Sequence, residues 1–236
     1  MVREIIDEIR SILKENADDA VRESGRRFFK EEIRLHGMKT PAVTKIGKNF
    51  FAAIKDQSKK TIFSLCDDLW NSGFLEESFI ACQWAYALRK NYRPEDFIVF
   101  ERWVKNVVTN WASCDTLCNH TIGTLVEMYP DTVERVVAWT DSENRWVRRA
   151  AAVTLIIPAR NGLFQKEIFV IADRLLMDTD DLVQKGYGWM LKAASEADQK
   201  AVLSFVMERR ATMPRTALRY AIEKMPPAMR AEAMQK

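Results

Sequence analysis

The chain has 236 residues and a formal net charge of +3, and 47% of its residues are apolar or aromatic. This composition excludes a disordered chain, a collagen-like fibre and a disulfide-stapled miniprotein, because enough apolar side chains are present to fill a core. No apolar run reaches the roughly 18 residues that span a bilayer, and the charged, amphipathic beginning of the chain does not resemble a signal peptide. We therefore expect a folded cytoplasmic protein that does not insert into membranes.

Helix signals recur in chain order. At Thr40-Pro41 a capping residue and a proline precede an apolar stripe from Val43 to Ile54, which predicts a helix. The next helix is predicted to start at Ser58. Arg93-Pro94-Glu95-Asp96 opens a further helix with acids in its first turn, where the macrodipole favours them. Its apolar face continues from Phe97 to Val107.

Later helices are predicted to start at Asp131 and Ser142. Prolines are expected to break or end helices, because proline lacks the N–H and clashes with the preceding turn; they are Pro130, Pro158, Pro214, Pro226 and Pro227. No convincing run of alternating apolar and polar residues is bounded by hairpin dipeptides. The sequence therefore predicts an all-α protein.

Two segments, 144–152 and 181–189, share one pattern, in which small residues follow Val147 and Val183 at three to five positions. Weaker copies surround Phe79 and Ala217. Helix pairs that recur every 33 to 47 residues or so are typical of HEAT-like stacks. We expect one HEAT-like α–α superhelix, a curved solenoid of antiparallel helix pairs, that forms a single domain over residues 1–236. The alternative is two ordinary helices that share an amphipathic motif.

Charge is unevenly distributed: residues 142–166 carry a net +4 and residues 200–236 a net +5, so the remainder is acidic. Two basic stretches on an acidic body indicate a surface that faces a polyanion. Taken alone, such runs are more often solvated helix faces.

Few residues offer catalytic chemistry. Trp111 and Asp115 are four residues apart and share a helical face, so the carboxylate can stabilise a cation beside an aromatic ring; alternatively, Asp115 caps a helix or is buried and hydrogen-bonded. The spacing of Cys114, Cys118 and His120 is only a weak indication of a metal site, since a structural zinc site needs four ligands.

These two cysteines, together with Cys66 and Cys82, are better explained as core residues of a protein in a reducing compartment. The sequence contains no Gly-x-Ser-x-Gly nucleophile elbow, no glycine-rich phosphate-binding loop and no dinucleotide-binding motif. We therefore expect no metal and no cofactor.

Taken together, Trp111-x-x-x-Asp115, Trp146-Val-Arg-Arg-Ala-Ala151 and Gly188-Trp189 resemble the bacterial AlkD family of DNA alkylation-repair glycosylases. The resemblance runs over most of the chain, from Gly37-Met-Lys-Thr-Pro41 to Gly186-Tyr-Gly-Trp-Met-Leu191, in the same order and at similar spacing. It implies an enzyme that excises N3- and N7-alkylated purines from double-stranded DNA, acting as a monomer near the nucleoid of a bacterial or archaeal cell.

Carried over residue by residue, the resemblance places the family's catalytic carboxylate at Asp115, its aromatic walls at Trp111 and Trp189, and its phosphate-holding arginine at Arg149. The further DNA-binding residues that we expect are six cations and one aromatic residue: Arg145, Arg148, Arg160, Lys185, Arg215, Arg219 and Phe28.

The sequence departs from the family pattern at two places. Ala112-Ser113 stands where active members have a Trp-Asp pair, and Phe28 stands where they have a tyrosine. A phenylalanine keeps the ring but lacks the hydroxyl that contacts phosphate or water. One alternative is therefore a non-catalytic HEAT-like binder of distorted or branched DNA. A second is a protein-binding scaffold, which is what most HEAT-like stacks are.

Overall fold

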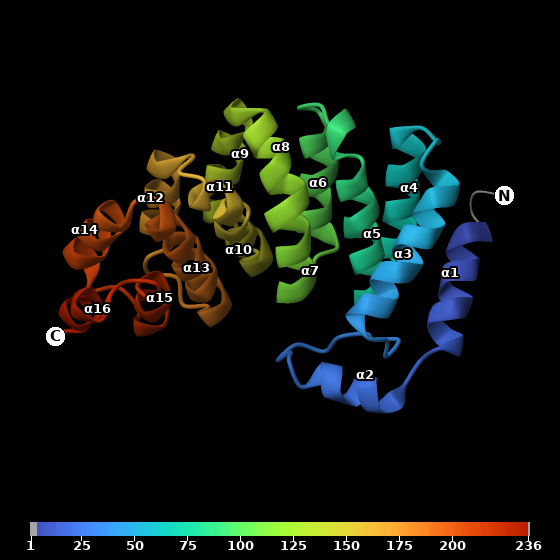
Figure 1. Cartoon of the computed structure of the whole chain (residues 1–236), viewed down its shortest axis with the longest axis horizontal. Helices are drawn as coiled ribbons and strands as arrows, with labels where there is room; N and C mark the ends of the chain where they lie inside the picture. The colour runs from blue at the N-terminus through green and yellow to red at the C-terminus, as the bar shows by residue number, and fades with distance from the viewer. Residues whose placement is uncertain (1–3, 236) are drawn as a thin grey trace. The chain divides into compact units, whose positions relative to one another are not determined.

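The structure, a computed structural model, describes residues 4–235, and it is all-α (Figure 1). Within those residues no β-strand forms, and backbone pairing of the β type is limited to an isolated bridge between Arg34 and Phe74. The all-α prediction is therefore confirmed. The chain divides into two compact units. The N-terminal unit comprises the chain up to Tyr92 together with Asn106–Thr116, and the C-terminal unit comprises Arg93–Lys105 and the chain from Leu117 onward. A single domain spanning the whole chain stays a prediction.

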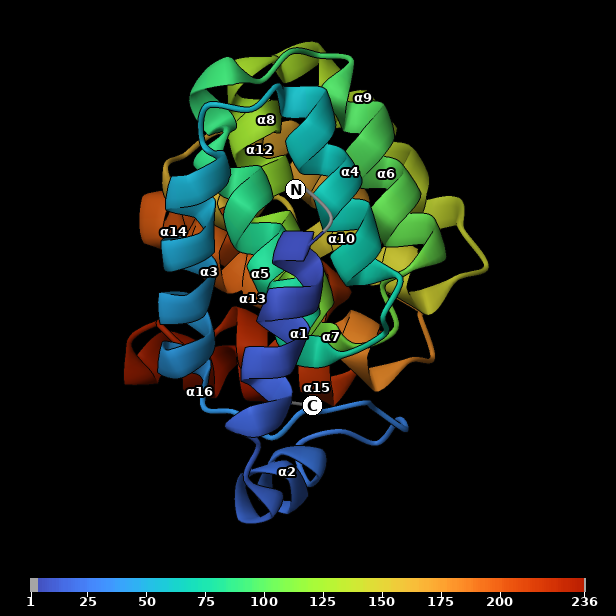
Figure 2. The same ribbon diagram turned by 90° about the vertical axis from the view of Figure 1, so that its right-hand side faces the viewer.

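The N-terminal unit is built around α5, which packs against α3, α4 and α7, while α1 packs against both α3 and α4. The short helix α2 lies beyond the ends of α1 and α3 in both views (Figures 1 and 2). The elements of this unit are α1 (Glu4–Glu15), α2 (Asp19–Arg26), α3 (Thr40–Ile54), α4 (Lys59–Trp70), α5 (Leu75–Ala87), the 3-10 turn η1 (Arg89–Asn91) and α7 (Trp111–Thr116).

The C-terminal unit is built around α13, which packs against α10, α11, α12, α14 and α15. Its elements are α6 (Asp96–Asn106), the π-helical turn η2 (Leu117–Ile122), α8 (Gly123–Met128), η3 (Pro130–Thr132), α9 (Val133–Ala138), η4 (Trp139–Asp141), α10 (Arg145–Val153), α11 (Ile156–Arg160), α12 (Gln165–Arg174), α13 (Asp181–Ala197), α14 (Gln199–Arg209), α15 (Arg215–Ala221) and α16 (Pro227–Met234). Among the described residues, no helix is both long enough and apolar enough to cross a bilayer.

Three predicted helix starts are confirmed. The helix α3 begins at Thr40, although its N-cap is Lys39. Ser58 caps α4, and its side chain accepts a hydrogen bond from the Thr61 N–H at 3.1 Å. At the start of α6, the Asp96 carboxylate accepts the Arg93 N–H at 2.8 Å. The Ser58 and Asp96 side chains each satisfy a backbone donor at the start of a helix, whereas no side chain caps α3.

Three other predictions need correction. Asp131 lies within η3, and α9 begins at Val133. The N-cap of α10 is Asn144 rather than Ser142, because the Asn144 side chain accepts the Trp146 N–H at 2.9 Å. Pro158 does not end a helix, since it lies in the first turn of α11. A proline is tolerated there because the missing N–H would have no acceptor within the helix.

The repeated segments fall on α10 and α13, which pack against each other. Gly188 shows why a small residue is needed on α13: a Cβ atom there would lie 2.7 Å from the Cβ of Tyr220 and 2.8 Å from the carbonyl oxygen of Ala217. The missing side chain therefore lets α13 and α15 approach closely. All four cysteines are buried free thiols, as expected of core residues.

Candidate functional site

Trp111, the first residue of α7, is held by the segment that follows α2. Its indole N–H donates a hydrogen bond to the Phe28 carbonyl at 3.3 Å, and its ring stacks on Phe29 with 5.3 Å between centroids and 20° between planes. The side chain is half-buried. Because the stacking partner and the hydrogen bond both restrict its rotation, the indole is oriented before any ligand arrives.

Trp111 forms part of the wall of a cavity of about 800 Å³ in the N-terminal unit. This volume is in the range of small-molecule sites. The wall is mostly apolar, with contributions from Phe28, Phe29, Pro41, Val43, Phe79 and Ala112, and with polar groups from Asp18, Lys39, Thr40 and Glu76. Phe28 is 72% exposed, an unusual position for a large apolar side chain. We call this space the Trp111 cavity.

Asp115 follows one turn after Trp111 on α7 and is half-buried. Trp111 and Asp115 therefore lie on one helix, as their spacing in the sequence predicted. The cavity wall includes Trp111 and Ala112 of α7 but not Asp115. Directly after α7 the helix continues as the π-helical turn η2. π-Helical turns are rare in proteins, but those that occur are often at functional sites. The extra residue in the turn changes the direction of the side chains around it.

Trp189 and Arg149 belong to the C-terminal unit. Trp189 is a half-buried residue of α13. Arg149, on α10, is only 5% exposed, and its guanidinium donates a hydrogen bond to the Leu182 carbonyl. A Cβ atom at Gly186 would lie 3.5 Å from the Cγ of Arg149, so the arginine stem packs over this glycine. One donor of Arg149 is thus committed to the protein's own backbone.

Most of the cations expected to bind DNA have acidic neighbours. The ion pairs are Arg145–Asp180 at 2.8 Å, Arg148–Asp178 at 2.6 Å, Arg160–Glu196 at 3.3 Å and Lys185–Asp181 at 3.1 Å. Arg215 donates to the Met234 carbonyl at 3.2 Å, and Arg219 is exposed. The net +4 counted over residues 142–166 is therefore partly neutralised by acids that lie some 30 residues later in the chain.

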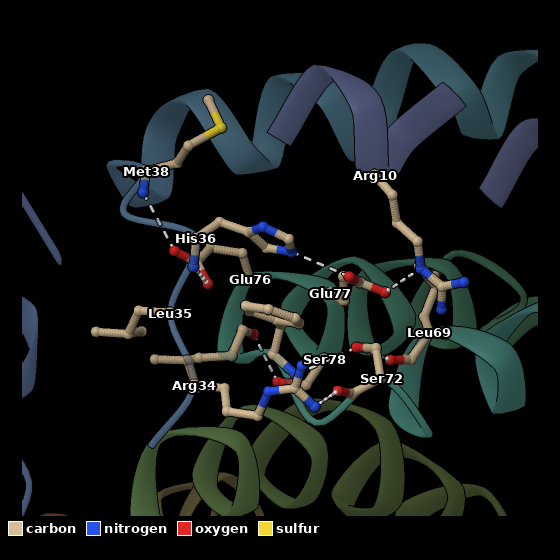
Figure 3. A network of polar contacts seen from close by, with 12 residues as sticks. Arg10, Arg34, Leu35, His36, Met38, Leu69, Ser72, Glu76, Glu77 and Ser78 are labelled. Carbon is tan, nitrogen blue, oxygen red and sulfur yellow. Dashed lines mark hydrogen bonds and ion pairs between the residues drawn. The ribbon is translucent and has the colours of Figure 1, made fainter. Parts of the chain in front are cut away.

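The segment before α3 is tied to α5 by a buried carboxylate (Figure 3). Glu76 is 3% exposed; its Oε1 accepts the N–H groups of Gly37 and Met38 at 2.8 and 3.1 Å, and its Oε2 accepts the N–H of His36 at 3.0 Å. Three charge-assisted hydrogen bonds offset the cost of burying this carboxylate. Since Gly37 and Met38 line the Trp111 cavity, Glu76 fixes one side of its wall.

The next residue, Glu77, is also buried and joins α5 to α1 and to His36. Its Oε2 accepts the Arg10 Nε–H at 3.0 Å, and its Oε1 lies 3.0 Å from His36 Nε2. The His36 ring stacks on Phe74 with 3.8 Å between centroids. Burial raises the pKa of Glu77, but the hydrogen bonds from His36 and Arg10 and the Arg10 charge outweigh it, so the net pKa lies below 4.5.

Sequence analysis did not identify Phe29, Glu76 or Glu77. Two acids that precede an apolar stretch are ordinary first-turn residues, and nothing in the local pattern shows that they are buried. The available signal was the rest of α5, from Phe79 to Ala87, because a helix that is apolar on nearly every side is buried.

The arrangement of helices is that of DNA alkylation repair enzymes. A solved structure described as a predicted DNA alkylation repair enzyme from Enterococcus faecalis matches 89% of this chain and 97% of its own, with a TM-score of 0.81 and 16% sequence identity. At that identity the likeness concerns the fold. The family model described as DNA alkylation repair enzyme matches residues 9–225. Among curated proteins no match is found. The chain belongs to the DNA alkylation repair enzyme family, as the resemblance in its sequence indicated.

Proposed function

We propose that the protein is a monofunctional DNA glycosylase that excises positively charged N3- and N7-alkylated purines from double-stranded DNA. Beyond family membership, the observation that carries the proposal is the pair on α7. Trp111 is half-buried and held in place at the edge of a cavity, and Asp115 is half-buried one turn away. An oriented aromatic ring and a half-buried carboxylate are the two groups that this reaction needs.

The chemistry requires little else. An alkylated purine is already cationic, so it leaves as a neutral base when the bond between C1′ and the purine nitrogen breaks, and no general acid is needed. The sugar develops oxocarbenium character, water then adds to C1′, and the proton that this water loses passes to the solvent. Asp115 opposes this developing charge and orients the water. A preformed charge in a partly desolvated position stabilises the transition state without reorganisation.

The remaining residues are proposed to bind the DNA and the lesion. Trp111 and Trp189 present ring faces to the cationic lesion or its deoxyribose, an attraction related to cation–π contacts. Arg149 is the arginine proposed to hold a phosphate, which sets register without selecting sequence. Arg215, Arg219 and Phe28 are exposed and contribute to DNA affinity. The protein acts as a monomer in the cytoplasm, at the nucleoid.

Release of 7-methylguanine from a methylated duplex tests this function directly. A glycosylase releases the base, whereas a non-catalytic binder of distorted DNA retains affinity for branched duplexes and releases nothing. A protein-binding scaffold differs from both, because its DNA affinity has almost no salt dependence. Neutralising several phosphates must instead give a clearly negative slope of log affinity against log salt. Absence of base release overturns the enzymatic proposal.

A further inference from the structure

The N-terminal unit contains a second cavity, of about 820 Å³, whose lining carries more basic than acidic side chains. Four basic side chains face two acidic ones, Asp68 and Glu77; the basic residues are Arg10, Lys14, Arg22 and Arg34. Leu35 contributes to the walls of both this cavity and the Trp111 cavity. We call the second space the arginine cavity. The sequence pattern gave no sign of it, because its cations come from α1, α2 and the segment before α3.

Neutral groups hold much of this positive charge in place. Arg22 donates from Nε to the Leu35 carbonyl at 3.2 Å and from a terminal nitrogen to the His36 carbonyl at 2.8 Å. Arg34 donates to the Ser72 carbonyl at 2.8 Å, and its guanidinium carbon lies 4.3 Å from the centroid of the Phe74 ring (Figure 3). Carbonyls and an aromatic face orient a guanidinium without neutralising it.

The acids nearby compensate only part of the charge. Glu77 accepts from Arg10, and Asp19, outside the lining, pairs with Arg22. Asp68 is the remaining acid of the lining. Within the part of the chain that the structure describes, neither Lys14 nor Arg34 forms an ion pair. A concave surface with two uncompensated cations and two further oriented guanidiniums attracts anions.

We propose that the arginine cavity binds a phosphate-bearing ligand, with Lys14 and Arg34 as its direct contacts and Arg10 and Arg22 as fixed charges around it. A guanidinium presents parallel N–H donors that match phosphate oxygens. The space is too large for an isolated phosphate and fits one that carries a further group, either a free nucleotide or a segment of a nucleic-acid strand. The proposal does not depend on base excision, because no residue assigned to that reaction lines this cavity.

The test uses the full chain and three lesion-free probes: inorganic pyrophosphate, adenosine monophosphate and an unmethylated ten-nucleotide single strand. Isothermal titration calorimetry compares the wild type with the Lys14→Gln/Arg34→Gln variant and with Lys55→Gln/Lys60→Gln. The second pair removes the same charge from exposed residues of the same unit that lie outside the cavity. The cavity pair should weaken binding about tenfold or more, since it removes two charge-assisted contacts; the control pair should change affinity less than about twofold.

The probes also distinguish the source of the phosphate. If the cavity pair weakens binding of pyrophosphate and the mononucleotide, the cavity is assigned to small phosphate esters; if it weakens binding of the strand alone, the cavity is assigned to a nucleic-acid backbone. Both results support the proposal. Failure of all three probes to bind overturns it, and so does an equal loss of affinity in the control pair. Should Arg34→Gln disturb folding, Lys14→Gln alone carries the test, because this exposed side chain makes no hydrogen bond or ion pair within residues 4–235. Shifts of the Arg22 and Arg34 Nε–H resonances on titration localise the ligand.

Discussion

The ring of Trp111 stacks on the ring of Phe29, 5.3 Å away between centroids, and so joins α7 to the segment that follows α2. The two residues lie far apart in the sequence. The contact means that the orientation of the proposed lesion-binding tryptophan depends on a segment that Glu76 in turn anchors to α5.

Phe29→Leu should therefore lower base release. Leucine fills much of the volume but offers no flat face, so the indole is less well oriented; the free energy of unfolding should fall by about 1–2 kcal/mol. Phe169→Leu is the matched control, because Phe169 is another half-buried ring that stacks on a phenylalanine, Phe205, with 5.1 Å between centroids. Urea unfolding should show a similar loss for both variants, and single-turnover base release should drop only for Phe29→Leu. Equal activities in the two variants would show that stacking does not position Trp111.

Gly188→Ala should separate α13 from α15. The added methyl group would lie 2.8 Å from the Ala217 carbonyl oxygen and 2.7 Å from the Cβ of Tyr220, so a helix has to shift, at a cost of roughly 1–3 kcal/mol. Gly186→Ala on the same helix is the control, since the nearest atom to its Cβ is 3.5 Å away, an ordinary contact. Thermal unfolding distinguishes them; a Gly186→Ala variant that is the less stable of the two contradicts the packing described here.

Glu76→Gln should release the segment before α3. Glutamine has one acceptor oxygen in place of two, so at least one of the N–H groups of His36, Gly37 and Met38 loses its partner, at about 1–3 kcal/mol. Hydrogen exchange of these three amides should accelerate, whereas the exposed substitution Glu95→Gln should leave them unchanged. Unaltered protection in Glu76→Gln would mean that the carboxylate does not hold the segment.

Glu77 should make the free energy of unfolding depend on pH in acid solution. Because the folded state lowers the pKa of this carboxyl below 4.5, the ionised form contributes stability above that pH, and the contribution is lost as the pH falls towards the folded-state pKa. The difference in unfolding free energy between the wild type and Glu77→Gln should be greatest above pH 4.5 and should shrink in more acidic solution. Urea titrations from neutral to acid pH measure it, with exposed Glu8→Gln as the control. A difference that stays constant over that range rules out the pairing with Arg10 and His36 as its source.

Local chemistry explains what the sequence could predict. The start of α3 follows from the proline in its first turn, and the start of α4 follows from the Ser58 side chain that accepts a first-turn N–H, so a few neighbouring residues are sufficient. The starts near Asp131 and Ser142 were misplaced because several neighbouring residues there can cap a turn, and the Ser142 and Asn144 side chains both accept a backbone N–H.

The site was predictable to the extent that it is local. Trp111 and Asp115 share one helix, so their spacing was sufficient to pair them. The contacts of Trp111 with Phe28 and Phe29 join distant segments, and no local pattern reports them. The same holds for Arg148, whose ion pair with Asp178 cannot be counted from the charge of its own segment.

Single-turnover release of 7-methylguanine by Asp115→Asn measures whether Asp115 stabilises the developing sugar cation. Asparagine keeps the size and removes the charge. The rate should be roughly 100-fold or more below that of the wild type, with DNA affinity retained and with the exposed control Asp56→Asn fully active. An Asp115→Asn variant that releases the base as fast as the wild type would contradict this role of Asp115.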